Sequence, residues 1–235
     1  MKVTYINHSC FLVETEKYQL LFDYATGELP VLDLEKPLYS FTSHFHHDHF
    51  NKRLFDLIKP HPDVHYIMAN SNYPTDMPDR LYKYTTLVEP NSEYNIGDLK
   101  LTTLKSTDEG VSYTVYTDCG LIYHAGDLNA WLWEGETESY NQKMKKDYIK
   151  EISKLKDMEF LLAFLPLDPR QSPEHRELGI KIFLQYTKTK NIFPMHMWDK
   201  YDIAPELAAK LGEQGKLFCN ATFNGQTFEI KEEPK

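Results

Sequence analysis

Cysteine is scarce in this chain and follows no pattern. The three cysteines, Cys10, Cys119 and Cys219, are far apart and form no CxxC pair. An odd, scattered set fits a reducing compartment better than a disulfide framework. The first residues enter a strand pattern directly, without the apolar segment of a signal peptide. We therefore expect a cytoplasmic location.

Positive charge is also in short supply. Lys and Arg number 26 against 35 Asp and Glu, which gives a formal net charge of -9. Nucleic-acid binders usually carry a basic footprint, so we expect no nucleic-acid partner. A small anionic substrate held at a metal is still compatible with this charge.

The chain also lacks linkers, repeats and membrane-length apolar runs. The apolar run at residues 160–165 is too short to span a bilayer and predicts a buried strand, so no membrane partner is expected. A hydrophobic content of 41% over 235 residues is enough for a sizeable core. Length alone allows one large domain or two small ones. Nothing in the sequence indicates an oligomeric state.

Histidine, by contrast, is concentrated in one place. Four of the ten histidines lie within residues 44–49, together with Asp48. A buried cluster of imidazoles and a carboxylate needs many polar partners, which packing alone does not supply. A divalent metal suits them all, because imidazole and carboxylate are ordinary ligands of zinc and other first-row metals. A solvated polar turn is the alternative.

This motif is predicted on a loop between a buried strand at residues 37–41 and a helix at residues 51–59. His44 and His46 are two apart in extended chain and therefore project to the same side. Asp48 and His49 follow where the chain turns into the helix, so they can face a second point nearby. His47 fits neither pair and is predicted to be a non-ligand that points away.

Other polar residues stand where predicted strands end. Residues 3–23 predict two strands with a turn near Glu16; His8 interrupts this pattern and Asp23 ends it. Two interpretations of His8 are open: a hydrogen-bonded histidine at the core or sheet edge, or one that approaches the metal pocket. Asp23 is interpreted as the hydrogen-bond partner of a metal-bound histidine, which would fix the tautomer of that ring.

Two later strand ends carry candidate ligands. A hairpin at residues 111–125 is followed by Gly126 and Asp127, and a carboxylate at this point could bridge two cations. His124 lies on the strand itself and should point elsewhere. A strand at residues 191–195 ends at His196.

The remaining pattern predicts the architecture. Helices are expected at residues 141–155, from residue 173 onward and at residues 203–211. This order of strands and helices suits two sheets packed face to face with helices outside. Trp131 and Trp133 could wall a pocket, although core packing is slightly favoured.

The H-x-H-x-D-H motif resembles that of the metallo-β-lactamase superfamily at all four positions. Further segments follow in the superfamily's order: Asn7-His8-Ser9, Asp23, Ala125-Gly126-Asp127 and Pro194-Met195-His196. The resemblance covers almost the whole chain and is greatest to the small metal-dependent hydrolases that include the phosphorylated-ascorbate lactonases. It implies an α/β (α+β) fold, a four-layer αββα sandwich, as a single domain over residues 1–235. It also implies one or two zinc ions as cofactor, with manganese or iron as other candidates.

By this resemblance the chain would hold two metals. The first would be bound by His44, His46, a further histidine and bridging Asp127. The second would be bound by Asp48, His49, Asp127 and His196.

The chain departs from the superfamily at one ligand. The further histidine usually follows the strand that here ends at Leu104, where this chain has Ser106-Thr107-Asp108-Glu109. No histidine lies between His65 and His124. Three outcomes are open: Asp108 or Glu109 replaces it, water fills the gap, or the first site stays empty.

The function we predict is that of a metal-dependent hydrolase, which uses a metal-activated hydroxide on a lactone or other ester of a small molecule. Asp48 would be both a ligand and the group that orients the hydroxide. Arg170 or Lys200 could hold an anionic group of the substrate, although a plain surface charge is the commoner role. The alternatives are a phosphodiesterase of the same fold and, because the first site is incomplete, a metal-dependent binding or sensor protein without turnover.

Overall fold

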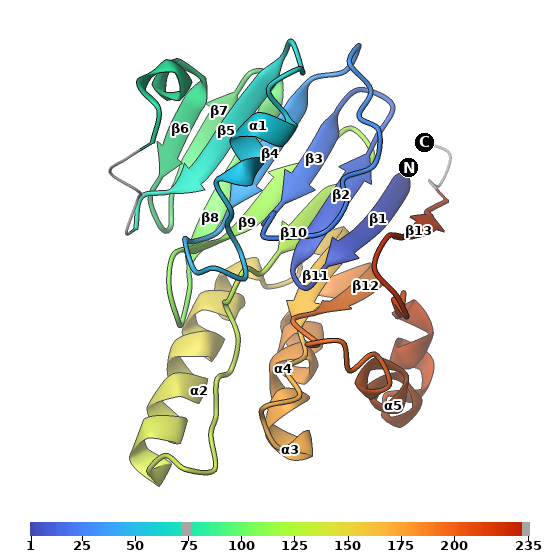
Figure 1. The fold of residues 1–235 in the computed structure, drawn as a ribbon. Coiled ribbons are helices and arrows are strands. Elements are labelled where there is room, and N and C mark those ends of the chain that lie inside the picture. Colours follow the sequence, from blue (N-terminus) through green and yellow to red (C-terminus); the bar gives the residue numbers. More distant parts are fainter. Residues whose placement is uncertain (72–76, 232–235) are drawn as a thin grey trace.

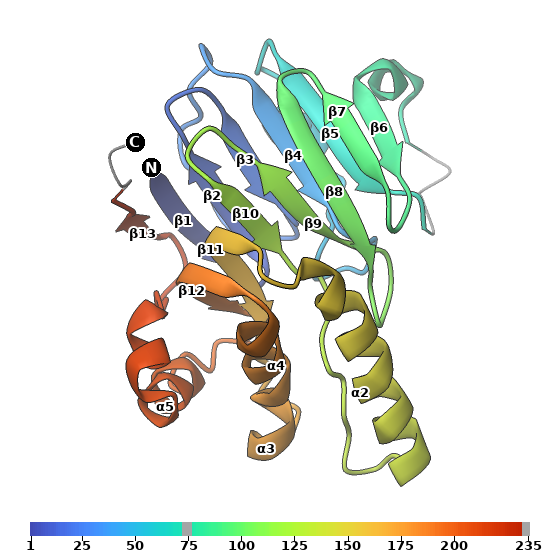
Figure 2. The same cartoon turned by 180° about the vertical axis from the view of Figure 1, so that it is seen from behind.

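Two β-sheets lie face to face at the centre of this computed structural model, which describes residues 1–71 and 77–231. Figures 1 and 2 show them as front and back layers from opposite sides. The first sheet has the order β13-β1-β2-β3-β4-β5-β6. Its strands are β1 (Lys2–Asn7), β2 (Cys10–Glu14), β3 (Gln19–Phe22), β4 (Leu38–Thr42), β5 (Val64–Ala69), β6 (Thr85–Val88) and β13 (Gln226–Glu229).

The second sheet has the order β12-β11-β10-β9-β8-β7. Its strands are β7 (Glu93–Ile96), β8 (Leu99–Lys105), β9 (Val111–Tyr116), β10 (Leu121–His124), β11 (Glu159–Pro166) and β12 (Lys188–Met195). Helices flank the sheets: α1 (Arg53–Leu57), α2 (Glu138–Ile152), α3 (Pro173–Arg176), α4 (Leu178–Tyr186) and α5 (Ile203–Lys210). Short 3-10 helices are η1 (Asp79–Tyr84), η2 (Ser153–Leu155) and η3 (Gly212–Leu217).

The inner faces of the two sheets share one hydrophobic core. Phe11 on β2 meets Phe164 on β11, with ring centroids 4.4 Å apart, and Phe41 on β4 meets Tyr113 on β9 at 5.1 Å. Side chains alternate between the faces of a strand, so Leu12 instead points outward into a second cluster with α1. The predicted pair of face-to-face sheets with outer helices is therefore confirmed. Over the first sheet, the described helices are only the short α1 and η1 (Figure 1).

Parallel pairing gathers several strand ends at one edge of the molecule. β3, β4, β5 and β6 pair in parallel in the first sheet, and β10, β11 and β12 do so in the second. In open α/β sheets, ligands bind outside the carboxyl ends of parallel strands. The residues just beyond these ends here are Asp23, Ser43, Asp127, Asp168 and His196.

Several predicted boundaries were wrong; among them, β12 begins at Lys188 and not at residue 191. Residues 3–23 form three strands, because a tight turn at His8 and Ser9 separates β1 from β2. Helix α1 is shorter than predicted, and Pro60 follows, which disfavours helical backbone in the residue before it. Helix α2 begins earlier, at Glu138, because the Thr137 side chain accepts a hydrogen bond from the Tyr140 backbone N–H at 3.2 Å. Within residues 1–71 and 77–231, no helix is long and apolar enough to cross a membrane.

Gly110 is predicted to be essential to the packing of the loop after β8. Its φ is +71°, and a Cβ added there would lie 1.9 Å from the Ser43 carbonyl oxygen. Gly110→Ala should lower the free energy of unfolding by at least about 2 kcal/mol, measured by chemical denaturation. Gly135→Ala is the matched control, since no heavy atom lies within 4 Å of its added Cβ. Equal stability of the two variants would contradict the prediction.

Candidate metal centre

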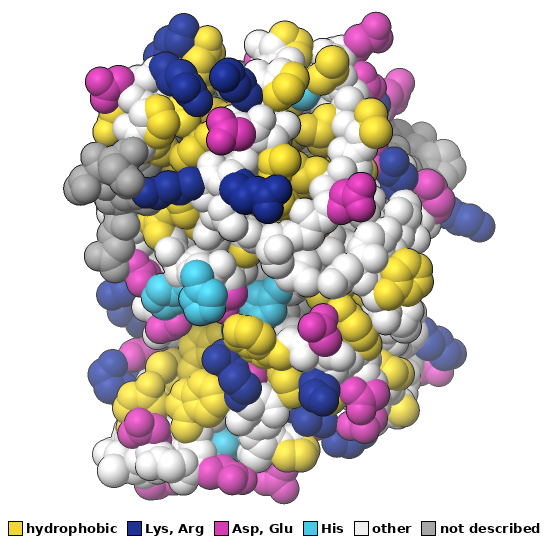
Figure 3. Space-filling view, viewed as in Figure 1, with side chains coloured by type: hydrophobic (Ala, Val, Ile, Leu, Met, Phe, Trp, Pro, Cys, Tyr) yellow, Lys and Arg dark blue, Asp and Glu magenta, His cyan; other side chains and the backbone are white. Residues whose placement is uncertain are grey.

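The histidine motif and the other strand ends form two adjacent clusters of metal-ligating atoms. In the first cluster, atoms of His44, His46 and Asp127 all lie within 4.8 Å of one another. In the second, the same holds for His8, Asp48, His49 and His196. Histidine side chains reach the surface midway along the face in Figure 3, between the sheets above and the helices below.

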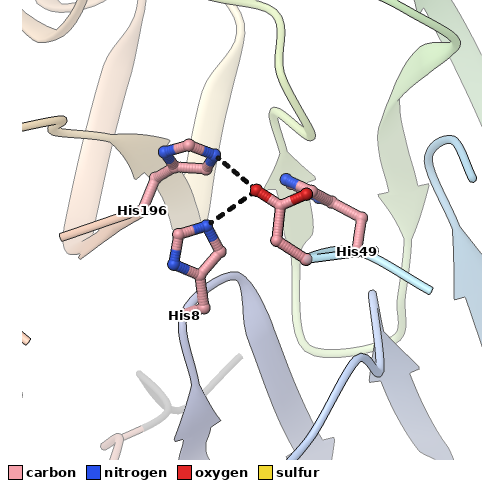
Figure 4. A group of neighbouring side chains, drawn as sticks. His8, His49 and His196 are labelled. Atoms are coloured by element: carbon pink, nitrogen blue, oxygen red, sulfur yellow. Dashed lines mark ion pairs between the residues drawn. The ribbon is translucent and has the colours of Figure 1, made fainter. Parts of the chain in front are cut away.

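The second cluster is built from three separate parts of the chain. His8 comes from the β1–β2 turn, Asp48 and His49 from the motif, and His196 from the end of β12. The Nε2 atoms of His8 and His196 lie 3.5 and 3.6 Å from Asp48 Oδ2, as the dashed lines of Figure 4 mark. The three imidazoles and the carboxylate thus surround one point.

Asp127 lies between the two clusters and presents one oxygen to each. Its Oδ1 is 3.1 Å from His49 Nε2 and 3.5 Å from His196 Nε2. Its Oδ2 is 3.6 Å from His44 Nε2 in the first cluster. One Asp127 oxygen thus faces each cluster, and the bridging of two metals by this carboxylate stays a prediction.

Several of these atoms are buried but make no hydrogen bond. They are His8 Nε2, His49 Nε2, His196 Nε2 and Asp127 Oδ1. A buried polar atom left without a partner costs roughly 1–3 kcal/mol, so four that converge need a common explanation. A divalent cation supplies it, because imidazole nitrogens and a carboxylate oxygen are its usual ligands. The residues present therefore fit a metal.

Hydrogen bonds on the outer side fix the ring tautomers in the second cluster. His49 Nδ1 lies 2.8 Å from Asp23 Oδ2, and His196 Nδ1 lies 2.9 Å from Asp168 Oδ2. An ionised carboxylate only accepts, so each Nδ1 donates its proton and leaves the Nε2 lone pair facing inward. Asp23 thus contacts the ring of a candidate ligand, and its role as partner of a metal-bound histidine stays a prediction. Asp168 was not singled out in the sequence, although it also follows a strand end.

The first cluster uses the same arrangement with different partners. Ser43 Oγ donates to Asp23 Oδ2 at 2.6 Å, so its lone pair is free to accept from His44 Nδ1 at 3.0 Å. His46 Nε2 lies 3.0 Å from a Glu109 carboxylate oxygen and donates to it. His44 Nε2 and His46 Nδ1 then face each other as two lone pairs, 3.1 Å apart. Two facing lone pairs cannot form a hydrogen bond, and a cation bound by both would account for this distance.

The acidic loop after β8 does not fill the place of the missing histidine. Glu109 contacts the outer nitrogen of His46, opposite the nitrogen that faces His44. Asp108 is not among the residues of either cluster. Burial and the neighbouring Asp127 carboxylate raise the pKa of Asp108. The first cluster therefore has three protein donors.

The pKa shifts differ between the histidines at the centre. Burial alone would lower the pKa of His49 and of His196, but Asp127 and the other carboxylates beside them outweigh it and raise both. For two other histidines burial prevails. Burial lowers the pKa of His44 to about 3, and His49 beside it acts in the same direction. Burial also lowers the pKa of His8. Burial by itself would raise the pKa of Asp127, but the imidazoles of His49 and His196 outweigh it and hold that pKa well below its usual value.

Backbone strain is concentrated around the second cluster. Among the described residues seven non-glycine residues have positive φ, and five of these are His8, Asp23, His196, Trp198 and Asp199. Such conformations cost on the order of 1–3 kcal/mol each and persist where the surroundings enforce them, often at functional sites.

Aromatic side chains enclose the same cluster. Trp131 is buried, lies 5.5 Å from His196 between ring centroids, and donates from Nε1 to the Asp127 carbonyl oxygen at 2.8 Å. Trp133 stacks on Trp131 at 6.1 Å. Trp131 is thus part of the core, as favoured, and also contacts a candidate ligand.

A cavity of about 310 Å³ opens beside the second cluster. Its lining includes His8, Asp48, Trp198 and the exposed side chain of His47. His47 belongs to neither cluster, in line with its predicted non-ligand role, but it faces the cavity rather than away from the centre. His124 stacks on Phe22 at 4.8 Å and its Nε2 faces the Ser9 carbonyl oxygen, so it points elsewhere, as expected.

Arg170 is bound to the outer side of the centre. Its Nε and Nη2 donate to the Asp168 carboxylate at 2.9 and 2.6 Å, and its guanidinium lies 4.9 Å from the centroid of the Trp198 ring. Arg170 therefore orients the Asp168 carboxylate, which accepts the hydrogen bond from His196 Nδ1. Lys200, the other cation considered for an anionic substrate group, is exposed.

Comparisons with known proteins identify the fold. No family model and no curated protein matches the chain by sequence. Its structure is similar to a metallo hydrolase from the archaeon Ignicoccus hospitalis, with 17% identity and a TM-score of 0.63 over 98% of this chain and 99% of that one. It is also similar to the metallo-β-lactamase fold protein YhfI from Bacillus subtilis, with 15% identity and a TM-score of 0.54 over 97% and 99% of the two chains.

A third similar structure has a different activity. CmlA, a diiron β-hydroxylase from Streptomyces venezuelae, matches with 9% identity and a TM-score of 0.63 over 97% of this chain and 54% of its own. Identities this low show the fold alone. The chain therefore has a metallo-β-lactamase fold, as predicted, while the expected similarity to ascorbate lactonases is not shown.

Asp23→Asn is predicted to weaken metal binding without unfolding the chain. The amide accepts less strongly than the carboxylate from Ser43 Oγ and His49 Nδ1. The His49 ring, and the His44 ring that contacts Ser43 Oγ, therefore become less well oriented. We expect metal affinity to fall roughly ten- to a hundredfold, the usual effect of losing an outer partner. Titration of the apo-protein with zinc would measure it. An affinity equal to wild type, with an intact circular dichroism spectrum, would contradict this role.

Proposed function

We propose that the chain is a metal-dependent hydrolase that acts on a lactone or other carboxylic ester of a small molecule. The observation that carries this proposal is the convergence of three buried imidazole nitrogens without hydrogen-bond partners, those of His8, His49 and His196, beside the Asp127 carboxylate. Metal-dependent hydrolysis is also the printed description of the Ignicoccus hospitalis protein with a similar structure.

The proposed ligands divide between two positions. His44, His46 and Asp127 would hold one metal, and Asp48, His49, Asp127 and His196 would hold the other. We propose zinc for both, with manganese or iron as alternatives. A metal held there would polarise the ester carbonyl and lower the pKa of water.

Residues of the chain would supply orientation and shape. Asp48 reaches the second cluster with Oδ2, and its second oxygen could orient the attacking water. The cavity of about 310 Å³ beside it limits the substrate to a small molecule. Arg170 has Nε and Nη2 engaged by Asp168, so the other amino group of its guanidinium is the proposed contact for an anionic substrate group. We propose a cytoplasmic location, because the three cysteines are scattered along the chain and form no CxxC pair.

Two alternatives rest on specific observations. A phosphodiesterase would use the same donors, but the net charge of -9 makes a polyanionic substrate less suitable. A metal-dependent binding or sensor protein without turnover is favoured by the first cluster, which has only three protein donors. The CmlA likeness adds that this fold also occurs in a hydroxylase, so fold alone does not select the reaction.

Substrate panels with metal analysis test the proposal. The purified protein is loaded with zinc or manganese, and its metals are counted by mass spectrometry. It is then assayed on lactones, carboxylic esters and phosphodiesters. Two metals per chain with ester or lactone turnover is the expected result. Metal binding without turnover would favour the sensor alternative, and phosphodiester turnover alone would favour the phosphodiesterase.

His49→Ala and His196→Ala are each predicted to abolish turnover and to release metal. Each removes a buried nitrogen that faces the second cluster and leaves the remaining charges uncompensated. His47→Ala is the control from the same stretch of chain, and it should retain wild-type metal content because His47 is exposed and outside both clusters. If His47→Ala lost its metals, the assignment of the motif would be wrong.

The loop after β8 leads to a further prediction about the first metal. Asp108→Ala should keep both metals, because Asp108 is outside the ligand clusters. Glu109→Gln should weaken only the first metal, by about tenfold, since it replaces the acceptor of His46 Nε2. Metal counts after dialysis against a chelator would measure both. Loss of one metal from Asp108→Ala would instead make Asp108 the substitute for the missing histidine.

A further inference from the structure

His8 is held in a strained turn against the metal centre. It sits between β1 and β2 with a φ of 51°, which a non-glycine residue adopts rarely. Its carbonyl oxygen accepts a hydrogen bond from the His196 backbone N–H at 3.2 Å, which ties this turn to the end of β12. The turn thus brings an imidazole from the start of the chain beside one from near its end.

Ring contacts then fix where the His8 side chain points. The ring centroid of His8 lies 4.1 Å from that of His196 and 4.6 Å from that of Trp198. Trp198 is in turn covered by the Arg170 guanidinium, which Asp168 holds. Rotation of the His8 ring would need several of these groups to move together.

The Nε2 atom of His8 is left without a hydrogen bond in this position. The residue is only 8% exposed, and the nitrogen faces Asp48 Oδ2 at 3.5 Å without hydrogen-bond geometry. It shares this condition with His49 Nε2 and His196 Nε2, which face the same cluster. A hydrogen-bonded core histidine would not leave its nitrogen in this state.

We infer that His8 is a direct metal ligand and the fifth protein donor of the second site. This inference rests on the proposed metal centre and goes beyond the four donors assigned there. The second site would then be closed by His8, Asp48, His49, Asp127 and His196, while the first keeps open positions. Closed sites hold metal firmly, and sites with three protein ligands and an open position are the ones that bind water or substrate. The two metals should therefore differ strongly in how fast they leave.

Metal release separates this role from a simple hydrogen bond between His8 and Asp48. Wild-type protein loaded with zinc is mixed with excess chromogenic chelator, and we expect a fast phase from the first site and a slow phase from the second. His8→Ala and His8→Gln should both accelerate the slow phase by at least about tenfold and leave the fast phase unchanged. Glutamine can still donate to Asp48, so a slow phase restored in His8→Gln alone would overturn the ligand role. The same conclusion would follow if both variants released zinc as wild type does.

Two controls keep the test decisive. His47→Ala should release zinc as wild type does, since His47 is exposed and outside both clusters. If the His8 variants do not fold, the nitrogen NMR spectrum of the wild-type imidazoles decides: zinc should shift His8 Nε2 as it shifts His49 Nε2, and an unshifted His8 would overturn the inference. A wild-type protein that binds no zinc would instead refute the proposed metal centre itself.

Discussion

The metal centre depends on one buried carboxylate. Asp127 is 4% exposed, and its Oδ1 has no hydrogen-bond donor, although it is surrounded by imidazoles. A buried charge of this kind is costly unless something of opposite sign compensates for it. Without a metal, protonated His49 and His196 would compensate this charge, since Asp127 raises the pKa of both rings. A cation on each side of Asp127 would compensate it with the imidazoles neutral and their lone pairs facing inward. The arrangement of His44, His49 and His196 around it follows from the same requirement.

Hydrogen bonds on the side of the histidine rings that faces away from Asp127 fix the orientation of these rings. Asp23 receives bonds from the Ser43 N–H, the Ser43 hydroxyl and His49, so one carboxylate orients ligands of both clusters. Asp168 likewise accepts a hydrogen bond from His196 and orients its ring, and Arg170 donates to the same carboxylate. Because each of these carboxylates follows a parallel strand, the same pairing that builds the sheets also sets the ring tautomers.

Much of this was predictable from the sequence, for identifiable reasons. The motif at residues 44–49 is local, and strand ends such as Asp127 and His196 are marked by apolar runs that stop at a polar residue. Parallel pairing then brings such residues together. The roles of Asp168 and Glu109 were not predictable in this way, because each depends on which neighbouring histidine ring lies beside it in three dimensions. The sequence showed that His8 interrupts the strand pattern, but not that a turn there separates two strands, because only the backbone shows the positive φ.

The donor set, more than the fold, therefore decides what chemistry this chain can support. A similar framework occurs in a metallo hydrolase and in a diiron hydroxylase, so the sheets alone permit both reactions. In this chain the proposed ligands divide unequally: the first site has no histidine after β8 and would stay open, while His8 would add a nitrogen to the second. His8, Asp48 and Trp198 line the cavity, so residues of the second site would also form part of the surface that a substrate contacts. Under the proposed division, the first site would supply the open coordination positions, and residues of the second would form the surface beside them that a substrate contacts.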